Sequence, residues 1–421
     1  SSAGRQSVEV GARGTYAIRR IVVVEMQVGE TRMPQRVLLG PGPSSVHPRV
    51  LQSMTLPVVG HLDAAFFQVM DDVSDLLRQV YHTDNFMTLP LSCTGTGAIE
   101  TACANIIERG DTMVVCRNGF FGNRMVDVAE RCGAEVHVVD SPWGKPMDVG
   151  DLERELSKHP KVKAVGVVHG ETSTGVLTPL REIIDLAHRH DAVVIVDAVT
   201  TLGGHDLRMD EWDIDVCFSA AQKCLGAPPG LAPISLGHRA MEVLKNRKTK
   251  VQSFYFNLQD LESYWSERRA YHHTSPISMT YAMREALRMT IEEGMETRLE
   301  RHARVAAALR AGVEALGLGL LADPDYRLNP LTTVIVPEGI DDAAVRQKLL
   351  NDYNIEIGGG LGELRGKIWR IGLMGDSARE VNVFALLSAL EIILASLGYE
   401  VAYGSSLSAA QRTLGVFQAA G

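Results

Sequence analysis

The sequence lacks features that would assign it to several classes of protein. Its six cysteines stand singly, with no CxxC pair, so neither a cysteine zinc site nor a disulfide framework is indicated. The 42 lysines and arginines are outnumbered by 51 aspartates and glutamates, and the net charge of -9 leaves no electrostatic footprint for nucleic acid. We therefore expect neither a bound metal nor a nucleic-acid partner.

Long uninterrupted apolar runs are also missing. The most apolar late stretch, residues 383–399, is interrupted by Ser388, Glu391 and Ser396, which is typical of a packed helix rather than of a membrane span. With 421 residues, 45% of them hydrophobic, the chain is long enough for two or more domains around a sizeable core. These properties predict a soluble globular protein with no membrane partner.

Three features of the sequence bear on the cellular compartment of the protein. Scattered cysteines favour a reducing interior. The first 20 residues carry several arginines and a single acid, which is typical either of an added leader or of the remnant of an organelle transit peptide. The last residues, FQAAG, are not a peroxisomal address. We expect an intracellular protein of the cytoplasm or of an organelle matrix, the mitochondrion being the candidate organelle.

Strand-like and helix-like segments alternate between residues 85 and 240. Short β-branched runs such as AVVIVDAV and DVCFSA are separated by amphipathic patterns such as PLREIIDLAHRH. This alternation predicts an α/β fold, with a three-layer αβα large domain built on a mainly parallel sheet. In such sheets, ligands bind beyond the carboxyl ends of the strands.

Beyond residue 277 the pattern changes to a long helical stretch, interrupted at Gly294, and then to shorter strands and helices. We interpret this part as a smaller α+β domain. The predicted organisation is a leader over residues 1–35, a large domain over 36–300, a small domain over 301–400 and a loose tail over 401–421.

Polar residues follow several of the predicted strands. A helix that begins at residues 94–97 offers free N–H groups to an anion such as phosphate, although glycine and threonine also start helices as ordinary caps. Asp197 ends the run AVVIV, either as a cap or loop acceptor or as the partner of a cationic ring nitrogen. Lys223 follows DVCF, either as a surface lysine or as a partly buried amine nucleophile.

These groups, with the hydroxyls of the segment ETSTG, share one edge of the predicted sheet. Pyridoxal phosphate needs this set: a lysine for a Schiff base, an acid for the pyridine nitrogen and a helix N-terminus for the phosphate. The sequence therefore predicts a pyridoxal phosphate site around Lys223 and Asp197. Arg370, the only charge within the apolar run IWRIGLM, either pairs with a buried carboxylate or clamps a substrate carboxylate.

The motifs in combination resemble the class V branch of the fold-type I aminotransferases, and within it the alanine–glyoxylate (serine–pyruvate) type. The resemblance extends from about residue 38 to about residue 395. The segments that carry it are LLGPGPS, NGFFGNR, HGETSTGVL, VDAVTTLGG, SAAQKCLGAPPG, YHHTSP, IEIGGGLGELRGK and WRIGLMG.

The resemblance implies a role for each matching position. Lys223 would form the Schiff base and then act as the general base, while Asp197 would pair with the pyridinium. Phe121, where the animal enzymes have tryptophan, would stack on one ring face. Val199 would cover the other face, and Thr172 would approach the ring hydroxyl.

The phosphate and the substrate have their own implied contacts. Arg370 would bind the substrate carboxylate, with Gly42 lining the site. The family often has histidine where Thr96 stands. The implied phosphate contacts are Thr94, Gly95, Thr96 and Gln222, with Tyr271 and Thr274 reaching it from the second subunit of a homodimer.

The implied activity is a ping-pong transfer of an amino group from alanine or serine to glyoxylate, giving pyruvate or hydroxypyruvate and glycine. Serine–glyoxylate, ureidoglycine–glyoxylate and pyridoxamine–pyruvate aminotransferases have similar lysine loops and stay open as alternatives. Outside this class, a non-catalytic αβα nucleotide-binding protein is the other hypothesis. A cysteine desulfurase is excluded, because no cysteine follows Cys224.

Overall fold

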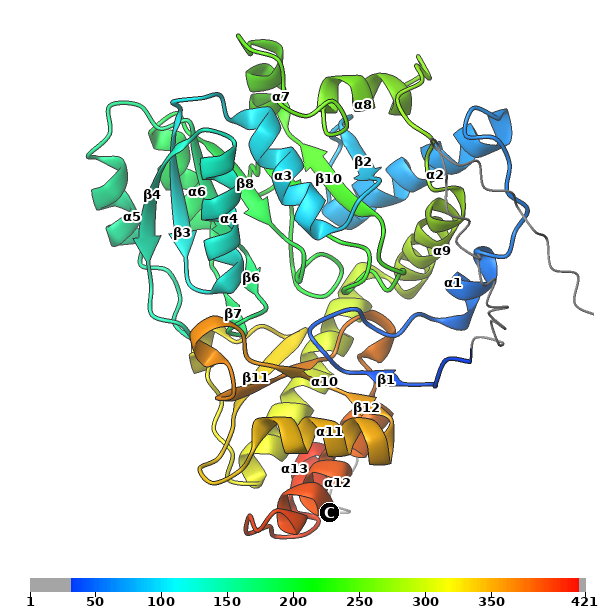
Figure 1. Ribbon diagram of the computed structural model, residues 1–421, viewed down its shortest axis with the longest axis vertical. Coiled ribbons are helices and arrows are strands. Elements are labelled where there is room, and N and C mark those ends of the chain that lie inside the picture. Colours follow the sequence, from blue (N-terminus) through cyan, green and yellow to red (C-terminus); the bar gives the residue numbers. More distant parts are fainter. Residues whose placement is uncertain (1–31, 416–421) are drawn as a thin grey trace, which may run out of the picture. The chain divides into compact units, whose positions relative to one another are not determined.

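The fold is described here from a computed structural model, which covers residues 32–415 of the chain (Figure 1). Residues from Arg36 onward form one compact unit by their contacts. The division of this unit into two domains near residue 300 stays a prediction. The leader predicted over residues 1–35 falls almost entirely outside the described residues, as do residues 416–421 of the predicted tail.

A seven-stranded sheet forms the centre of the first half of the unit. Six of its strands run in one direction, and β10 alone runs antiparallel to both of its neighbours. The predicted mainly parallel sheet is therefore confirmed. In spatial order the strands are β2 (Thr88–Leu91), β10 (Ala232–Leu236), β9 (Val216–Phe218), β8 (Val193–Asp197), β5 (Ala164–Val168), β3 (Thr112–Arg117) and β4 (Glu135–Asp140).

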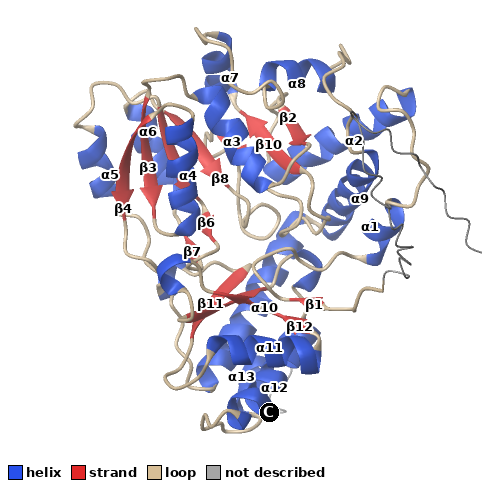
Figure 2. Ribbon diagram, viewed as in Figure 1, coloured by secondary structure: helices blue, strands red, loops and turns tan. Residues whose placement is uncertain are grey.

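Helices cover both faces of this sheet, as Figure 2 shows. The inner strands are fully buried runs of β-branched residues, because neither face meets water. Alternate residues of β8 point to opposite cores: Val194 packs with one set of helices and Ile195 with the other. The first set is α1 (Pro48–Ser53), α2 (Ala64–Tyr81), α5 (Val149–Leu156), α6 (Leu180–Arg189) and α9 (Ile277–Glu293), and the second is α3 (Gly95–Ile106), α4 (Phe120–Arg131), α7 (His238–Lys245) and α8 (Leu258–Trp265).

A second, three-stranded antiparallel sheet lies in the later part of the chain, with its own apolar core. Its central strand β14 carries Arg370, which is paired in register with Thr333 on one side and Gly358 on the other. The strands are β11 (Leu331–Ile335), β14 (Ile368–Gly372) and β13 (Gly358–Gly359), and the helices of this part are α10 (Met295–Ala315), α11 (Asp342–Tyr353), α12 (Glu380–Ser396) and α13 (Ser405–Thr413).

Two further strand pairs connect the parts of the unit. The parallel pair β1 (Val37–Leu38) and β12 (Ile355–Glu356) joins the start of the described chain to the second sheet. The short hairpin of β6 (Gly170–Glu171) and β7 (Val176–Leu177) contacts that sheet, because Thr333 Oγ1 donates to the carbonyl oxygen of Thr174 at 2.8 Å.

Two expectations about helices have different outcomes. The interruption at Gly294 is confirmed, since α9 ends at Glu293, α10 begins at Met295 and Gly294 has a φ of 85°. The expectation of a loose tail is wrong for residues 405–413. They form α13, which packs on α10 and α12 and buries Ser406 and Ala410, and Glu391 of α12 accepts hydrogen bonds from the backbone N–H and hydroxyl of Ser406.

Among the described residues, no helix has both the length and the apolar character that crossing a membrane would require.

The segment after β1 is threaded closely between β14 and the large sheet. Gly372 N donates to the carbonyl oxygen of Leu39 at 2.8 Å, and a Cβ on Gly372 would lie 2.1 Å from the carbonyl oxygen of Gly40. The partner atom belongs to the backbone, so the contact cannot be relieved by a side-chain rotation. This close approach places Gly42, two residues later, beside the loop that follows β9.

We expect Gly372→Ala to lower the free energy of unfolding by about 1–3 kcal/mol, because the extra methyl group forces two backbone segments apart. Urea unfolding followed by circular dichroism measures this loss. Gly60→Ala is the matched control, since no atom lies within 4 Å of a Cβ there. Equal stability of the two variants would contradict the close approach.

Candidate active site

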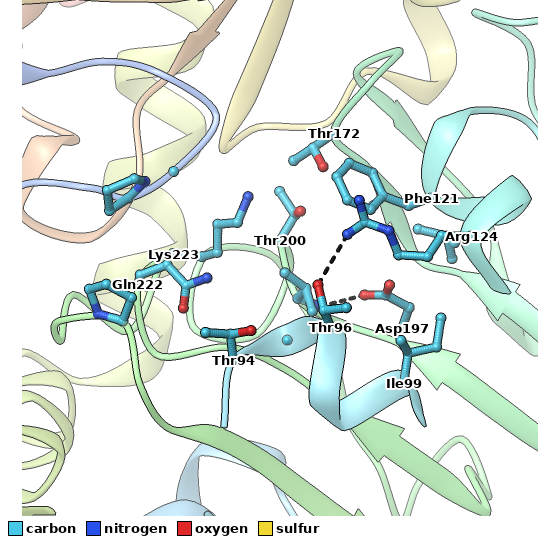
Figure 3. Close-up of a pocket in the computed structure, with 17 residues that line it drawn as sticks. Thr94, Thr96, Ile99, Phe121, Arg124, Thr172, Asp197, Thr200, Gln222 and Lys223 are labelled. Carbon is cyan, nitrogen blue, oxygen red and sulfur yellow. Dashed lines mark hydrogen bonds between the residues drawn. The ribbon is translucent and has the colours of Figure 1, made fainter. Parts of the chain in front are cut away.

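A cavity of about 250 Å³ opens at the carboxyl ends of the parallel strands (Figure 3). The fold explains its position, because the loops after β2, β5, β8 and β9 meet at this edge. All but three of the residues predicted from the sequence line it. They are Gly42, Thr94, Gly95, Thr96, Phe121, Thr172, Asp197, Val199, Gln222 and Lys223.

Lys223 lies in the loop by which β9 reverses into the antiparallel strand β10. The side chain is 9% exposed, and Nζ donates to the carbonyl oxygen of Pro41. Burial, together with the positive charge of Arg370, lowers the pKa of Lys223 to about 8. The reading of this residue as a surface lysine is therefore wrong: its amine is desolvated and is readily obtained in the neutral, nucleophilic form.

Gly42 makes room for the lysine side chain. A Cβ at this position would lie 2.6 Å from Lys223 Cδ and 2.9 Å from Nζ, and the φ of Gly42 is 110°, which L side chains rarely adopt. The glycine requirement of the GPGP segment thus arises from direct contact with the stem of Lys223.

Asp197 ends β8 and is 6% exposed. Its Oδ1 accepts a hydrogen bond from Val199 N at 2.9 Å, but no salt bridge to it forms within residues 32–415. Burial raises the pKa of Asp197 to about 7, and this outweighs the opposing effect of that hydrogen bond and of the charges on Lys223 and Arg124. A buried carboxylate of this kind is suited to a cationic partner, which the described residues do not supply.

The start of α3 provides hydrogen-bond donors to the same cavity. Thr94 is the N-cap, but its side chain makes no capping hydrogen bond. The first-turn N–H groups of residues 95–97 therefore face the cavity edge without an intrahelical acceptor. Gln222 Oε1 lies nearby, buried and without a hydrogen-bond partner among the described atoms, which indicates that a ligand or water completes its contacts.

The sequence analysis missed Arg124, although it quoted the segment NGFFGNR. The guanidinium carbon of Arg124 lies 5.0 Å from the ring centroid of Phe121 and 5.5 Å from that of Phe120, and Nη1 donates to Thr96 Oγ1 at 3.2 Å. Arg124 follows Phe121 by three residues on α4, a spacing that places both on one helix face. That spacing was the available signal for a cation at the cavity.

Glu171 was also missed, hidden within the segment ETSTG. It is fully buried, and its Oε2 accepts hydrogen bonds from the backbone N–H groups of Phe121 and Gly122 at 3.0 and 3.2 Å, while Ser173 donates to Oε1. Burial raises its pKa, against these hydrogen bonds. Glu171 therefore fixes the first turn of α4 and with it the ring of Phe121.

Arg370 does not line the cavity but lies against it. Its Nε donates to the carbonyl oxygen of Gly359 at 2.7 Å and Nη1 to that of Thr172 at 3.4 Å. The side chain is 7% exposed and has no ion pair within the described part of the chain, and burial lowers its pKa to about 10. The alternative of a structural arginine paired to a buried carboxylate is not what the structure shows.

Tyr271 and Thr274 are the two predicted residues that lie away from this cavity. Both are exposed in the single chain, Tyr271 by 63%. Their assignment to the site of a second subunit stays a prediction.

Comparison with known proteins assigns the chain to a protein family. The sequence model described as aminotransferase class V matches residues 37–363. This chain belongs to the class V aminotransferases. Pyridoxal phosphate is the cofactor of this family, and the protein is a transaminase that depends on it.

Three similar proteins span nearly the whole chain. The (S)-ureidoglycine–glyoxylate transaminase of Bacillus subtilis is 42% identical over 406 residues, covering 92% of this chain and 97% of its own. The crystal structure of alanine–glyoxylate aminotransferase from Nostoc sp. is 44% identical, with a TM-score of 0.86 and coverage of 88% and 98%. That of pyridoxamine–pyruvate aminotransferase from Mesorhizobium loti is 29% identical, with a TM-score of 0.86 and coverage of 92% and 100%.

The residues present fit this cofactor. A desolvated lysine amine, a buried carboxylate without a salt bridge, an amide oxygen without a partner and the open first turn of α3 all meet in one cavity. Each of these groups keeps hydrogen-bonding or charge-pairing capacity of the kind that a phosphorylated pyridine aldehyde would complete.

In the cofactor-free protein, we expect Asp197→Asn to raise the free energy of unfolding, and to raise it more at pH 8 than at pH 4. The folded-state pKa of about 7 lies above the unfolded value of 3.8, so the stability contributed by the protonated carboxyl is lost as pH rises between these values. The advantage of the variant therefore grows through this window, to at most about 4 kcal/mol.

Urea titrations of both proteins across this pH range, with the exposed Asp352→Asn as control, measure the difference. A stability gain that does not depend on pH would show that the buried carboxylate is not the cause.

Proposed function

We propose that the protein transfers an amino group from alanine or serine to glyoxylate, giving pyruvate or hydroxypyruvate and glycine in a ping-pong reaction. The observation that carries the proposal is the arrangement of a desolvated Lys223 amine and a buried Asp197 carboxylate in one cavity, with Arg370 against its wall. The similarity to aminotransferases named for glyoxylate supports the acceptor.

The cation beside the cavity supports an amino acid as the amino donor. Arg370 offers its guanidinium to an α-carboxylate, for which the planar fork of donors is well matched.

When bound, pyridoxal phosphate supplies an aldehyde carbon and a ring that withdraws electrons from the substrate Cα. Asp197 would hold the ring nitrogen in its protonated form, and the first turn of α3 would receive the phosphate oxygens. Phe121 would cover one ring face and Val199 the other, with Thr172 near the ring hydroxyl.

Lys223 would have two tasks. Its neutral amine would hold the cofactor at the aldehyde carbon, and it would be free to act as a base once the substrate occupies that position. Nζ would then take the proton from the substrate Cα and return it on the cofactor side, as a general base whose pKa of about 8 lies near physiological pH. Arg370 would orient the substrate so that this Cα–H bond faces Nζ.

The alternatives differ in the amino donor and, for pyridoxamine–pyruvate transfer, also in the acceptor. Serine–glyoxylate, ureidoglycine–glyoxylate and pyridoxamine–pyruvate transfer all use the same cofactor groups, and two of these activities are named for similar proteins. Family membership removes the non-catalytic nucleotide-binding alternative. We further propose a homodimer in which Tyr271 and Thr274 contact the cofactor phosphate of the neighbouring subunit. Their exposure in the single chain is consistent with this role.

The donor is identified by a half-reaction screen. Alanine, serine, (S)-ureidoglycine and pyridoxamine are each mixed with holoenzyme, and the conversion of the cofactor from its aldehyde to its amine form is timed by absorbance. We expect alanine or serine to react fastest. Faster reaction with pyridoxamine or ureidoglycine would replace the proposed donor.

Lys223→Ala is the control for this screen, and it should lose the visible band of the lysine-bound cofactor and the activity together. Lys145→Ala, on an exposed side chain, should keep both.

We expect Arg370→Lys to raise the KM for the amino donor by about 10- to 100-fold, because an ammonium cannot make the two parallel hydrogen bonds of a guanidinium. Steady-state kinetics measure the change, and the visible band reports that the cofactor is still bound. The exposed Arg365→Lys is the control. An unchanged KM combined with lower stability would assign Arg370 a structural role instead.

A further inference from the structure

Two imidazoles and a carboxylate converge on the surface where β4 meets the end of α5, outside the catalytic cavity. His159 Nε2 lies 3.1 Å from Glu155 Oε1, and His137 Nδ1 lies 3.8 Å from the same oxygen. All three ligand-type atoms fall within 4.8 Å of one another. None of these residues lines the cavity that contains Lys223.

The fold, rather than sequence proximity, assembles this group. Glu155 and His159 are four residues apart, in α5 and the turn that follows it, so they lie on one side of that helix end. His137 comes from the middle of β4, the edge strand that packs against α5. The two imidazole rings lie face to face, with centroids 3.9 Å apart and a tilt of 35°. Both rings therefore present a nitrogen to the same carboxylate oxygen.

These separations match those around a four-coordinate ion. Zinc binds imidazole nitrogen at about 2.0–2.1 Å and carboxylate oxygen at about 2.0–2.2 Å, so ligand atoms of a tetrahedral site lie roughly 3.3 Å apart. Two of the three separations are 3.1 and 3.8 Å, and the two imidazole nitrogens lie within 4.8 Å of each other, so the side chains must move closer together to reach this spacing. Three protein ligands leave the fourth position to water.

The ordinary alternative is a surface cluster of hydrogen bonds and ion pairs. Lys158 Nζ lies 2.6 Å from Glu155 Oε2, and this contact leaves Oε1 to the two imidazoles. Oε1 can therefore act as a ligand while Lys158 stays in place, although the ammonium weakens the attraction for a cation. Hydrogen bonding explains the Lys158 and His159 contacts, but it does not explain His137, whose Nδ1 at 3.8 Å lies too far from Oε1 for a hydrogen bond.

We propose that His137, Glu155 and His159 bind one divalent transition-metal ion of the zinc class. Two imidazoles and a carboxylate favour zinc, copper or nickel over magnesium and calcium, which prefer all-oxygen ligand sets. The ion joins the edge strand of the large sheet to α5 and takes no part in transamination. Reasoning from cysteine spacing predicted no metal, because these ligands carry no cysteine and His137 stands 18 residues before Glu155.

The test is a calorimetric titration of the holoenzyme with zinc chloride, repeated with magnesium chloride. We expect one saturable zinc site and no magnesium binding. His137→Ala and His159→Ala should each weaken zinc binding by at least about tenfold, with transaminase activity unchanged. His238→Ala is the matched control, because His238 and Glu242 form a pair of the same i,i+4 spacing, 3.6 Å apart, to which residues 32–415 add no third ligand.

A second variant distinguishes the loss of a metal ligand from damage to the fold. Lys158→Gln removes the competing ammonium and should tighten zinc binding severalfold, a change that damage to the fold would not produce. Zinc should also raise the melting temperature of the wild type but not that of the double variant His137→Ala/His159→Ala. The proposal is overturned if the wild type shows no saturable zinc binding. It is also overturned if zinc binding survives in the double variant, as it would if the cofactor held the zinc.

Discussion

The active site depends on two opposite charges that are taken out of water without being paired. Burial lowers the pKa of Lys223 to about 8 and raises that of Asp197 to about 7, because desolvation disfavours the charged form of each group. No salt bridge forms on either side chain within the described chain, and neither is exposed by more than 9%. A cavity built in this way is incomplete by itself and is completed by a ligand that carries an aldehyde and a cationic ring.

The surrounding structure serves to keep this arrangement rigid. Gly42 allows the backbone of the N-terminal segment to lie against the stem of Lys223, and Gly372 allows the same segment to lie against β14. Glu171, itself buried, holds the first turn of α4 by its backbone N–H groups. The parts of the cavity therefore come from segments that are far apart in the chain, and close backbone approaches together with the buried Glu171 carboxylate fix their positions.

Much of the fold and the site could be predicted from particular residues. The fully apolar runs around Val194 and Val167 indicated a sheet covered on both faces, and Gly294 marked the interruption of a long helix. Strand-terminal Asp197 and the loop lysine Lys223 indicated the chemistry. Local patterns could not show that residues 405–413 would be a docked helix, because it packs on α10 and α12 and Ser406 donates hydrogen bonds to Glu391 of α12.

The sequence by itself determined the type of chemistry and the strand ends that carry it, because short polar segments after apolar runs are local signals. Only the tertiary structure decided how those groups behave, since burial and neighbouring charge set each pKa. It also decided that Arg370 lies against Thr172, that Arg124 reaches Thr96, and that His137 meets Glu155 and His159. These contacts join residues that are far apart in the chain or on different elements, and packing alone brings them together.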